Sequence, residues 1–216
     1  MKLKIVHKSY SCAPQTKDEL KEIIKERLAD DPNADLNDID ISNITDMSEL
    51  FLNLDPCSID ISQWDVSNVK NTHGMFWGCK NFNSDLSSWD VSKIKDMYAM
   101  FFNCMNFNSD LSVWDVSNVT DMNKMFAGCE NFNSDLSDWD VSKVEDMYCM
   151  FEYCQNFNSD LSNWDVSHVN DMRFMFKGCI KFNSNLNKWN VSNVEYMRFI
   201  FMDCDSMKKL PEWYKS

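Results

Sequence analysis

The pattern of apolar and polar residues along this chain repeats every 25 residues. Tryptophan, phenylalanine and cysteine each recur at that spacing, and no insertion interrupts them. The three columns are Trp64, Trp89, Trp114, Trp139, Trp164 and Trp189; Phe51, Phe76, Phe101, Phe126, Phe151, Phe176 and Phe201; and Cys79, Cys104, Cys129, Cys154, Cys179 and Cys204. A fixed period of about 20–50 residues is typical of folds built from stacked repeats.

Within one repeat the apolar pattern predicts two kinds of element. In DMNKMFAGC, the apolar residues Met122, Met125, Phe126 and Cys129 fall at i, i+3, i+4 and i+7, which predicts a helix of about two turns. The segment that follows spaces its apolar residues by two to four and ends with Trp and Val, which favour a strand. We therefore expect an α/β repeat solenoid in which each coil holds a short strand, a corner and a short helix, with the strands of neighbouring coils parallel.

The N-terminal segment predicts a cap for this stack. Thr16 and Glu19 form a capping box, and Leu20, Ile24 and Leu28 share one face of the helix that follows, together with Ile23. The predicted organisation is a cap over residues 1–37, with its helix at about 17–29, and about seven 25-residue repeats over 38–216. The last repeat is degenerate, and atypical end repeats are what a stacked array needs.

Charge narrows the set of partners. The 216 residues carry a formal charge of −13 and a sequence pI near 4.5. Nucleic-acid binding requires a stripe of Lys and Arg, and anionic membrane surfaces also attract basic segments, so we expect neither partner. No apolar run reaches the roughly 18 residues of a membrane span, and the start shows no apolar leader region, so the sequence alone predicts a cytoplasmic protein.

The repeated phrase FNSDLSxWDVSNVxDMxxMFxGC, present five times with small changes, resembles one known family. It is similar to BspA-like leucine-rich-repeat surface proteins, in the 25-residue class of mycoplasma domains of unknown function. The similarity covers roughly residues 14–213. It implies a leucine-rich-repeat-like right-handed coil, exposure at the cell surface, and binding of proteins or host material. It implies no catalytic residues.

The invariant columns admit chemical alternatives to a structural role. The cysteine column predicts buried thiols, because free cysteine behaves as a small hydrophobe; disulfides between coils and a metal site are the alternatives. The tryptophan column predicts core, with a sugar-stacking platform as the alternative. Two aspartate columns predict turns that bond to backbone N–H groups, with stacked calcium ligands as the alternative: Asp65, Asp90, Asp115, Asp140 and Asp165; and Asp85, Asp110, Asp135 and Asp160. An asparagine column is expected to form a buried amide ladder: Asn83, Asn108, Asn133, Asn158 and Asn183.

The sequence gives no sign of an enzyme. The three histidines, His7, His73 and His168, stand in different contexts, and no pairing of nucleophile and base recurs. We predict no catalytic residue, no cofactor and no metal site.

The positions that change between repeats carry the prediction of function. Beside the core stripe, random surface drift would favour small and charged residues, yet aromatic residues and arginine gather there. Aromatic residues and arginine are enriched at protein interfaces and their hot spots. The candidate partner-binding residues are Trp77, Tyr98, Phe102, Tyr148, Arg173, Phe174, Arg198 and Phe199.

The sequence thus predicts a non-enzymatic interaction module that binds a protein through this variable face. Two alternatives stay open. One is a surface adhesin that depends on carbohydrate or calcium and uses the Trp or Asp columns. The other is a structural rod that self-associates.

Overall fold

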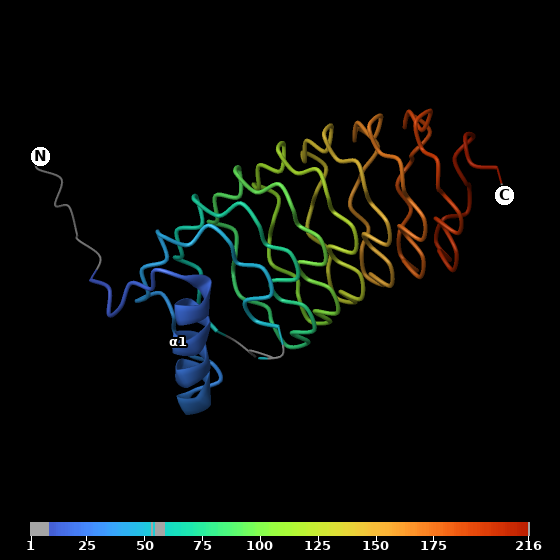
Figure 1. The fold of residues 1–216 in the computed structure, drawn as a ribbon. Helices are drawn as coiled ribbons and strands as arrows, with labels where there is room; N and C mark the ends of the chain where they lie inside the picture. The colour runs from blue at the N-terminus through green and yellow to red at the C-terminus, as the bar shows by residue number, and fades with distance from the viewer. Residues whose placement is uncertain (1–8, 53, 55–58, 216) are drawn as a thin grey trace, which may run out of the picture.

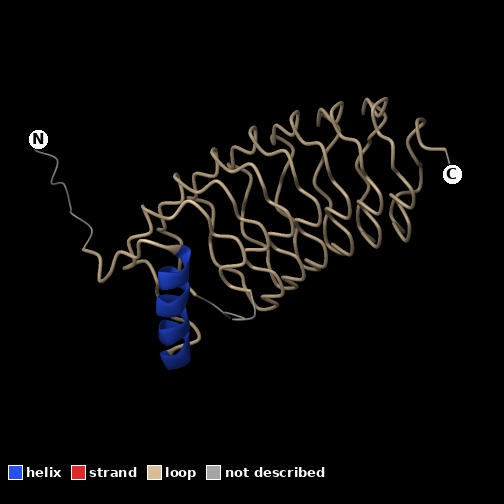
Figure 2. Ribbon diagram, in the orientation of Figure 1, coloured by secondary structure: helices blue, strands red, loops and turns tan. Residues whose placement is uncertain are grey.

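The computed structural model describes residues 9–52, 54 and 59–215. Within these residues one regular helix forms, α1 (Lys17–Asp30), and the rest winds as turns and short extended segments. Figure 1 shows these segments as coils stacked in chain order from α1 to the C-terminus, and Figure 2 shows α1 beside a body of loops. The parts of the predicted cap and repeats at residues 1–8, 53, 55–58 and 216 lie outside the described residues.

Neighbouring coils are joined by isolated parallel backbone bridges between residues 25 apart, and a further bridge joins Cys12 to Ile39. One column of bridges runs the length of the stack: Asp46↔Asn71, Asn71↔Asp96, Asp96↔Asp121, Asp121↔Asp146, Asp146↔Asp171 and Asp171↔Tyr196. Each coil contributes one bridge residue to this column rather than a run of them. Consequently no β-strand forms in the part of the chain that the structure describes.

The prediction of a helix in each repeat is wrong. In the Met122–Cys129 segment, the N–H of Met125 donates to Met122 C=O and the N–H of Cys129 to Phe126 C=O, which are turns rather than α-helical bonds. Within this part of the described chain, the N–H groups of the alternate residues make no hydrogen bond within their own coil. Those of Met122, Lys124, Phe126 and Gly128 donate to the C=O groups of Asp146, Tyr148, Met150 and Glu152 in the next coil, over 2.7–3.1 Å.

Energetics explain why turns replace the helix. A helix of about two turns is marginal, because its costly nucleus is repaid by few hydrogen bonds. Successive turns satisfy the same groups by bonding to the next coil instead. Lys124 and Gly128 adopt positive φ values of 57° and 77°, which aim alternate N–H groups along the stack and are incompatible with a right-handed helix.

The prediction of parallel strands is wrong as well. The Trp/Val segment is folded by two turns, closed by Trp114 N–H to Leu111 C=O and by Val119 N–H to Val116 C=O. These turns interrupt the extended backbone, so that only isolated bridges form. The fold is therefore not an α/β solenoid with parallel strands, and the leucine-rich-repeat coil that the resemblance implied is not supported. It is a stack of turn-rich coils with one helix at its start.

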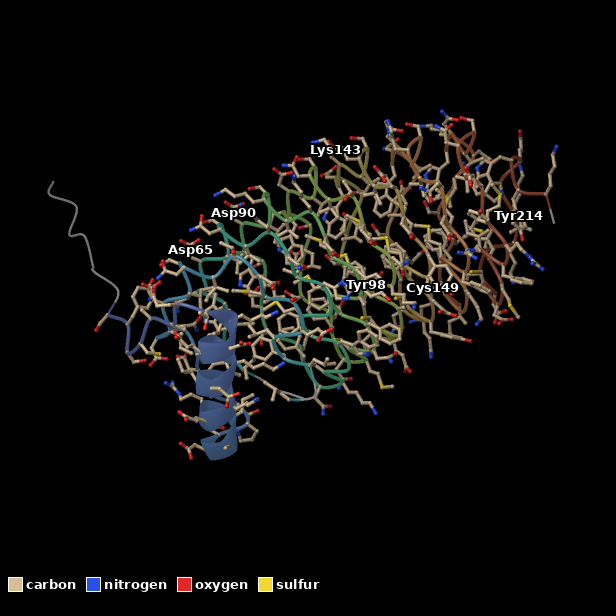
Figure 3. The ribbon with its side chains drawn as sticks, viewed as in Figure 1. Asp65, Asp90, Tyr98, Lys143, Cys149 and Tyr214 are labelled. Atoms are coloured by element: carbon tan, nitrogen blue, oxygen red, sulfur yellow. The ribbon has the colours of Figure 1, made fainter. Side chains whose placement is uncertain are left out.

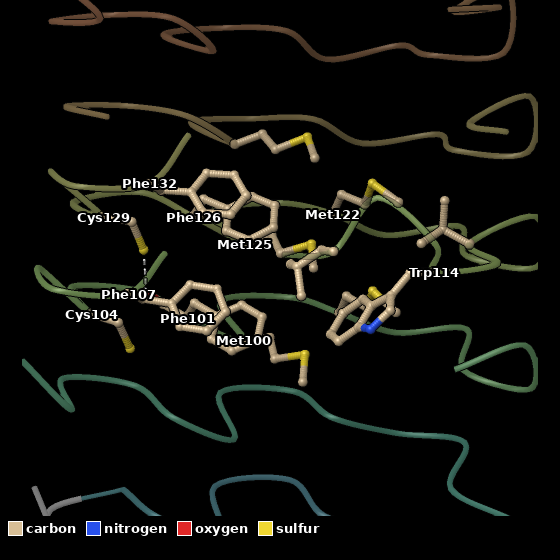
Figure 4. Packing of buried hydrophobic residues seen from close by; sticks show 14 of the residues in the cluster. Met100, Phe101, Cys104, Phe107, Trp114, Met122, Met125, Phe126, Cys129 and Phe132 are labelled. Atoms are coloured by element: carbon tan, nitrogen blue, oxygen red, sulfur yellow. Dashed lines mark hydrogen bonds between the residues drawn. The ribbon is translucent and has the colours of Figure 1, made fainter. Parts of the chain in front are cut away.

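The invariant apolar columns form one continuous core (Figure 4). Phe101 and Phe126 stack with ring centroids 5.7 Å apart at 4°, and Phe107 and Phe132 stack at 5.9 Å and 8°. Burying each ring contributes roughly 1.5–3 kcal/mol. Trp114 is only 3% exposed, and its indole N–H donates to a backbone C=O of the preceding coil over 3.0 Å. The tryptophan column is thus core with its polar atom satisfied.

The helix α1 covers the first coils, as the sequence predicted. The Thr16 hydroxyl accepts a hydrogen bond from the N–H of Glu19 over 3.2 Å at the start of the helix. Leu20 and Ile24 are fully buried in the core, and Ile23 and Leu28 pack against it.

Polar contacts fix the helix against the same coils. The ammonium of Lys17 lies 3.1 Å from an Asp46 carboxylate oxygen, and Lys21 donates to the C=O of Glu49 over 2.8 Å.

Candidate functional site

The eight candidate residues lie on the turns that follow the Asp bridges. We define the variable face by these eight residues together with two neighbours, His73 and Lys124. Six of the eight are half-buried, whereas Arg198 and Phe199 in the last coil are exposed. In Figure 3, Tyr98 on this face lies away from the edge that carries Asp65, Asp90 and Lys143. The variable face and the aspartate corners are therefore separate surfaces of the stack.

The first group of the face is made of two ring pairs, one stacked and one edge-to-face. The His73 and Tyr98 rings stack with centroids 4.4 Å apart at 12°. Trp77 and Phe102 meet edge-to-face at 5.0 Å and 78°. The next coil continues the second pair with Ala127, which is 2% exposed, so this pair ends there.

A lysine links the first group to the second. The Lys124 ammonium lies 5.9 Å from the Tyr98 ring centroid and 5.4 Å from that of Tyr148, which places a cation between two aromatic faces. Lys124 was not among the predicted site residues. A signal for it was present in the sequence. Lys124 directly follows Asn123, whose column carries tyrosine in the coil before, Tyr98, and in the coil after, Tyr148.

The second group is built around Arg173. Its guanidinium lies 5.1 Å from the Tyr148 ring centroid and 5.0 Å from that of Tyr196. It also donates hydrogen bonds to the Asp171 carboxylate, and this pairing raises the pKa of the arginine. The acid is almost fully buried beneath it. Arg173 is therefore held close to two aromatic rings by its pairing with a buried carboxylate.

Phenylalanines extend the second group to the last coil. Phe174 meets Tyr148 edge-to-face at 6.1 Å and stacks on Phe199 at 5.4 Å. Arg198 lies 5.3 Å from the Phe199 ring centroid. The structure thus brings six of the eight predicted residues into one strip through Lys124, while Trp77 and Phe102 form a separate pair.

The bridge column places carboxylates along the same strip. His73 Nδ1 lies 3.7 Å from an Asp96 oxygen, and the Asn123 amide donates to Asp146 over 3.3 Å. Burial raises the pKa of Asp121, and the charges of Asp146 and Asp96 raise it further. The strip therefore combines aromatic faces, cations and partly buried carboxylates, a mixture suited to polar and aromatic contacts with a protein.

The cysteine column holds buried free thiols, as predicted. The Cys104 thiol donates to the C=O of Phe76, 3.0 Å away in the preceding coil. Burial raises the pKa of Cys129 and of Cys154 well above the usual range, which makes these thiols poor nucleophiles. Cys149, beside Tyr148, is also buried, and desolvation raises its pKa to about 12.

The aspartate corners are turns, as predicted. Asp110 accepts the N–H of Ser112 over 2.9 Å, and this bond is the main reason that the pKa of Asp110 is lowered. Among the residues that the structure describes, no group of three or more His, Cys, Asp or Glu side chains could hold a metal ion.

The asparagine column differs from its prediction in one respect. The amide oxygen of Asn108 accepts the N–H of Asn133 over 2.8 Å, so the ladder between coils exists. Both residues are exposed rather than buried. The buried polar column beside it is serine: the Ser134 hydroxyl accepts the N–H of Leu111 over 2.8 Å. A hydroxyl is small enough to be enclosed there, whereas the amide reaches solvent.

The arrangement defines a repeat protein in which an invariant scaffold carries a variable surface. The chain belongs to the DUF285 family, described as a Mycoplasma protein of unknown function, whose signature matches residues 19–139 and again 99–214. No curated protein and no solved structure matches the chain. Across the described residues, no helix has the length and apolar character required to cross a membrane.

Proposed function

We propose that this chain is a non-enzymatic interaction module that binds a protein through the variable face. The observation that carries the proposal is the strip from His73 to Phe199, where rings and cations change from coil to coil while the core beneath them does not. Half-exposed aromatic residues and arginines fixed by neighbours lose little conformational entropy on binding, as hot-spot residues require.

We also propose that the chain belongs to the BspA-like repeat class and acts at the cell surface. The repeated phrase supports this proposal by its resemblance to those surface proteins. Of the alternatives, the sugar-stacking platform is disfavoured because the indoles of the tryptophan column are 3–4% exposed and offer no ring face to a ligand.

A quantitative pull-down from cell-surface extract tests the proposed function. The test variant combines Tyr98→Ser, Tyr148→Ser and Phe174→Ser. The matched control makes the same kind of change at exposed apolar residues outside the face, with Met105→Ser, Val113→Ser and Ile180→Ser. Circular dichroism first establishes that all three proteins are folded.

We expect a partner that wild type and the control variant retain and the test variant loses. Equal capture by all three proteins would overturn the proposal. Sedimentation distinguishes the remaining alternative: if the test variant changes the oligomeric state of the pure protein, the face serves self-association.

A further inference from the structure

The last coil leaves an edge of backbone donors open. In every earlier coil, N–H groups on the turn segment donate to C=O groups of the next coil, as Gly178 does to Met202 over 2.8 Å. In the last coil, the N–H groups of Met197, Phe199, Phe201 and Asp203 occupy the same positions. Within the described chain they have no acceptor.

A small hollow lies beside this edge. It has a volume of about 240 Å³ and is lined by Met197, Arg198, Phe199, Tyr214 and Lys215. Its floor is apolar and its two charged side chains are basic. Phe199 is 45% exposed, so a large apolar surface stands next to unpaired donors. An edge of this kind is a template for pairing with another chain.

Charge separates this end from the rest of the molecule. Residues 171–216 carry eight Lys and Arg against five Asp and Glu, a formal charge of +3; residues 1–170 carry thirteen against twenty-nine, a formal charge of −16. Three acidic columns lose their charge in the last full coil, at Asn185, Asn190 and Tyr196. Residues 195–215 of the last coil carry four Lys and Arg against four Asp and Glu, so the edge as a whole is neutral. The charged side chains that line the hollow, Arg198 and Lys215, are both basic.

We propose that this edge binds an acidic polypeptide segment in extended conformation, which adds to the stack as a partial further coil. Its alternate carbonyls accept the N–H groups of Met197 and Phe199, one apolar side chain fills the hollow, and its carboxylates lie beside Arg198 and Lys215. Main-chain bonds of this kind give affinity, while the pocket and the charges give specificity.

The edge geometry disfavours a second copy of this chain as the occupant. Such a copy would have to present the carbonyl edge of its first coil, and that end lies under α1, where Leu20 and Ile24 are fully buried. Two C-terminal edges facing each other would place N–H donors opposite N–H donors. A separate acidic segment meets neither obstacle.

The chain itself supplies a probe and its control. Residues 145–153, EDMYCMFEY, carry three acidic side chains. In the intact stack, their carbonyl groups accept hydrogen bonds from the N–H groups of Met122, Lys124, Phe126 and Gly128. Residues 170–178, NDMRFMFKG, present carbonyls in the same register but carry a formal charge of +1. Both peptides are made with blocked ends and a fluorophore, and the acidic one with Cys149→Ser.

Fluorescence anisotropy with the full chain then tests the proposal. We expect saturable binding of the acidic peptide, at least about tenfold weaker binding of the basic one, and weakening by salt. Combining Arg198→Glu and Lys215→Glu should weaken the affinity for the acidic peptide by at least about tenfold. Lys93→Glu with Lys143→Glu, the same charge change at exposed positions elsewhere, should leave affinity within about twofold.

Several results would overturn this inference: no saturable binding to wild type, equal binding of the two peptides, or equal losses in both charge variants. A wild-type dimer that Arg198→Glu with Lys215→Glu dissociates would assign the edge to a second copy instead. A variant with only Tyr98→Ser and Tyr148→Ser, which keeps Phe174 stacked on Phe199, should bind the acidic peptide as wild type does. Failure of this proposal is thus distinguishable from failure of the proposed function.

Discussion

At the N-terminal end of the stack α1 covers the first coils, and Leu20 and Ile24 are fully buried. At the C-terminal end no helix of the described residues covers the last coil, and Tyr196, Phe199 and Met202 are 45–51% exposed. Both ends are built from turn-rich coils of the same kind, and the contrast lies in what packs against each end. A coil of this fold is complete only when a neighbour receives its N–H groups and covers its apolar residues.

Hydrogen exchange should show the largest contrast. In the middle of the stack, the amides of Met122, Lys124 and Phe126 donate to the next coil, and we expect exchange slowed by about a thousandfold or more. The amides of Met197 and Phe199 should exchange near the rate of an unfolded chain. Residue-resolved NMR on the monomer measures both sets. Equal protection would mean that something covers the open edge.

Truncation of one apolar side chain at each end should give the next largest effect. Leu20→Ala leaves a cavity between α1 and the coils, and we expect a loss of about 2–5 kcal/mol in unfolding free energy. Leu210→Ala removes a similar side chain that is 43% exposed near the other end, and should cost less than about 1 kcal/mol. Urea denaturation measures both. Similar losses would contradict the contrast between a closed and an open end.

Two glycines test whether the coils themselves differ along the stack. Gly78, nearer α1, has positive φ, and a Cβ there would meet no atom of the described residues within 4 Å, whereas a Cβ on Gly178 would lie 2.5 Å from a ring carbon of Tyr153. Gly78→Ala should therefore cost about 1 kcal/mol and Gly178→Ala about 1–3 kcal/mol. Thermal and urea unfolding compare them. If adding Tyr153→Ala to Gly178→Ala restores none of the lost unfolding free energy, contact with the Tyr153 ring is not the cause of that loss.

The smallest effect concerns the pH dependence of the capped end. Hydrogen bonds from Ser11 and then Arg27 lower the pKa of Asp38 below 3.8. A lowered folded-state pKa means stability that is present above pH 4 and lost as the pH falls through the folded value. Arg27→Met should flatten this acid limb by less than about 1 kcal/mol, because the pair is more than one-third exposed. Arg198→Met, at the open end, is the control and should leave the limb unchanged.

The sequence patterns correctly predicted which repeated apolar residues are buried. They did not predict the backbone conformation, because it depends on hydrogen bonds to the neighbouring coil. The columns of Trp114, Phe126 and Cys129 are buried as expected, and α1 falls where its cap and apolar face predicted. The i, i+3, i+4, i+7 spacing was attributed to a helix, but successive turns place the same residues inward. The two differ in where alternate N–H groups point, and that is decided by carbonyls 24 residues further along, as between Met122 and Asp146.

The missed turns left a weak trace in the sequence. All four glycines of the chain adopt positive φ, but the position of Gly74 is held in other coils by Ala99, Lys124 and Phe174, which also have positive φ. Those residues hide the left-handed conformation that glycine alone would have indicated. The variable face was identified as a set of columns, whereas the bridging role of Lys124 depends on distances between coils.

One turn position also limits how the chain can grow. Along the stack this position reads Gly78, Asn103, Gly128, Tyr153, Gly178 and Asp203, in strict alternation. Each following glycine makes room for the side chain before it: a Cβ on Gly128 would lie 2.3 Å from the Asn103 amide oxygen. Duplicating a single repeat would set two bulky residues, or two glycines, against each other. During evolution, repeats should therefore be gained or lost in pairs. The chain length would then change in steps of fifty residues, and bulky residues and glycines would continue to alternate.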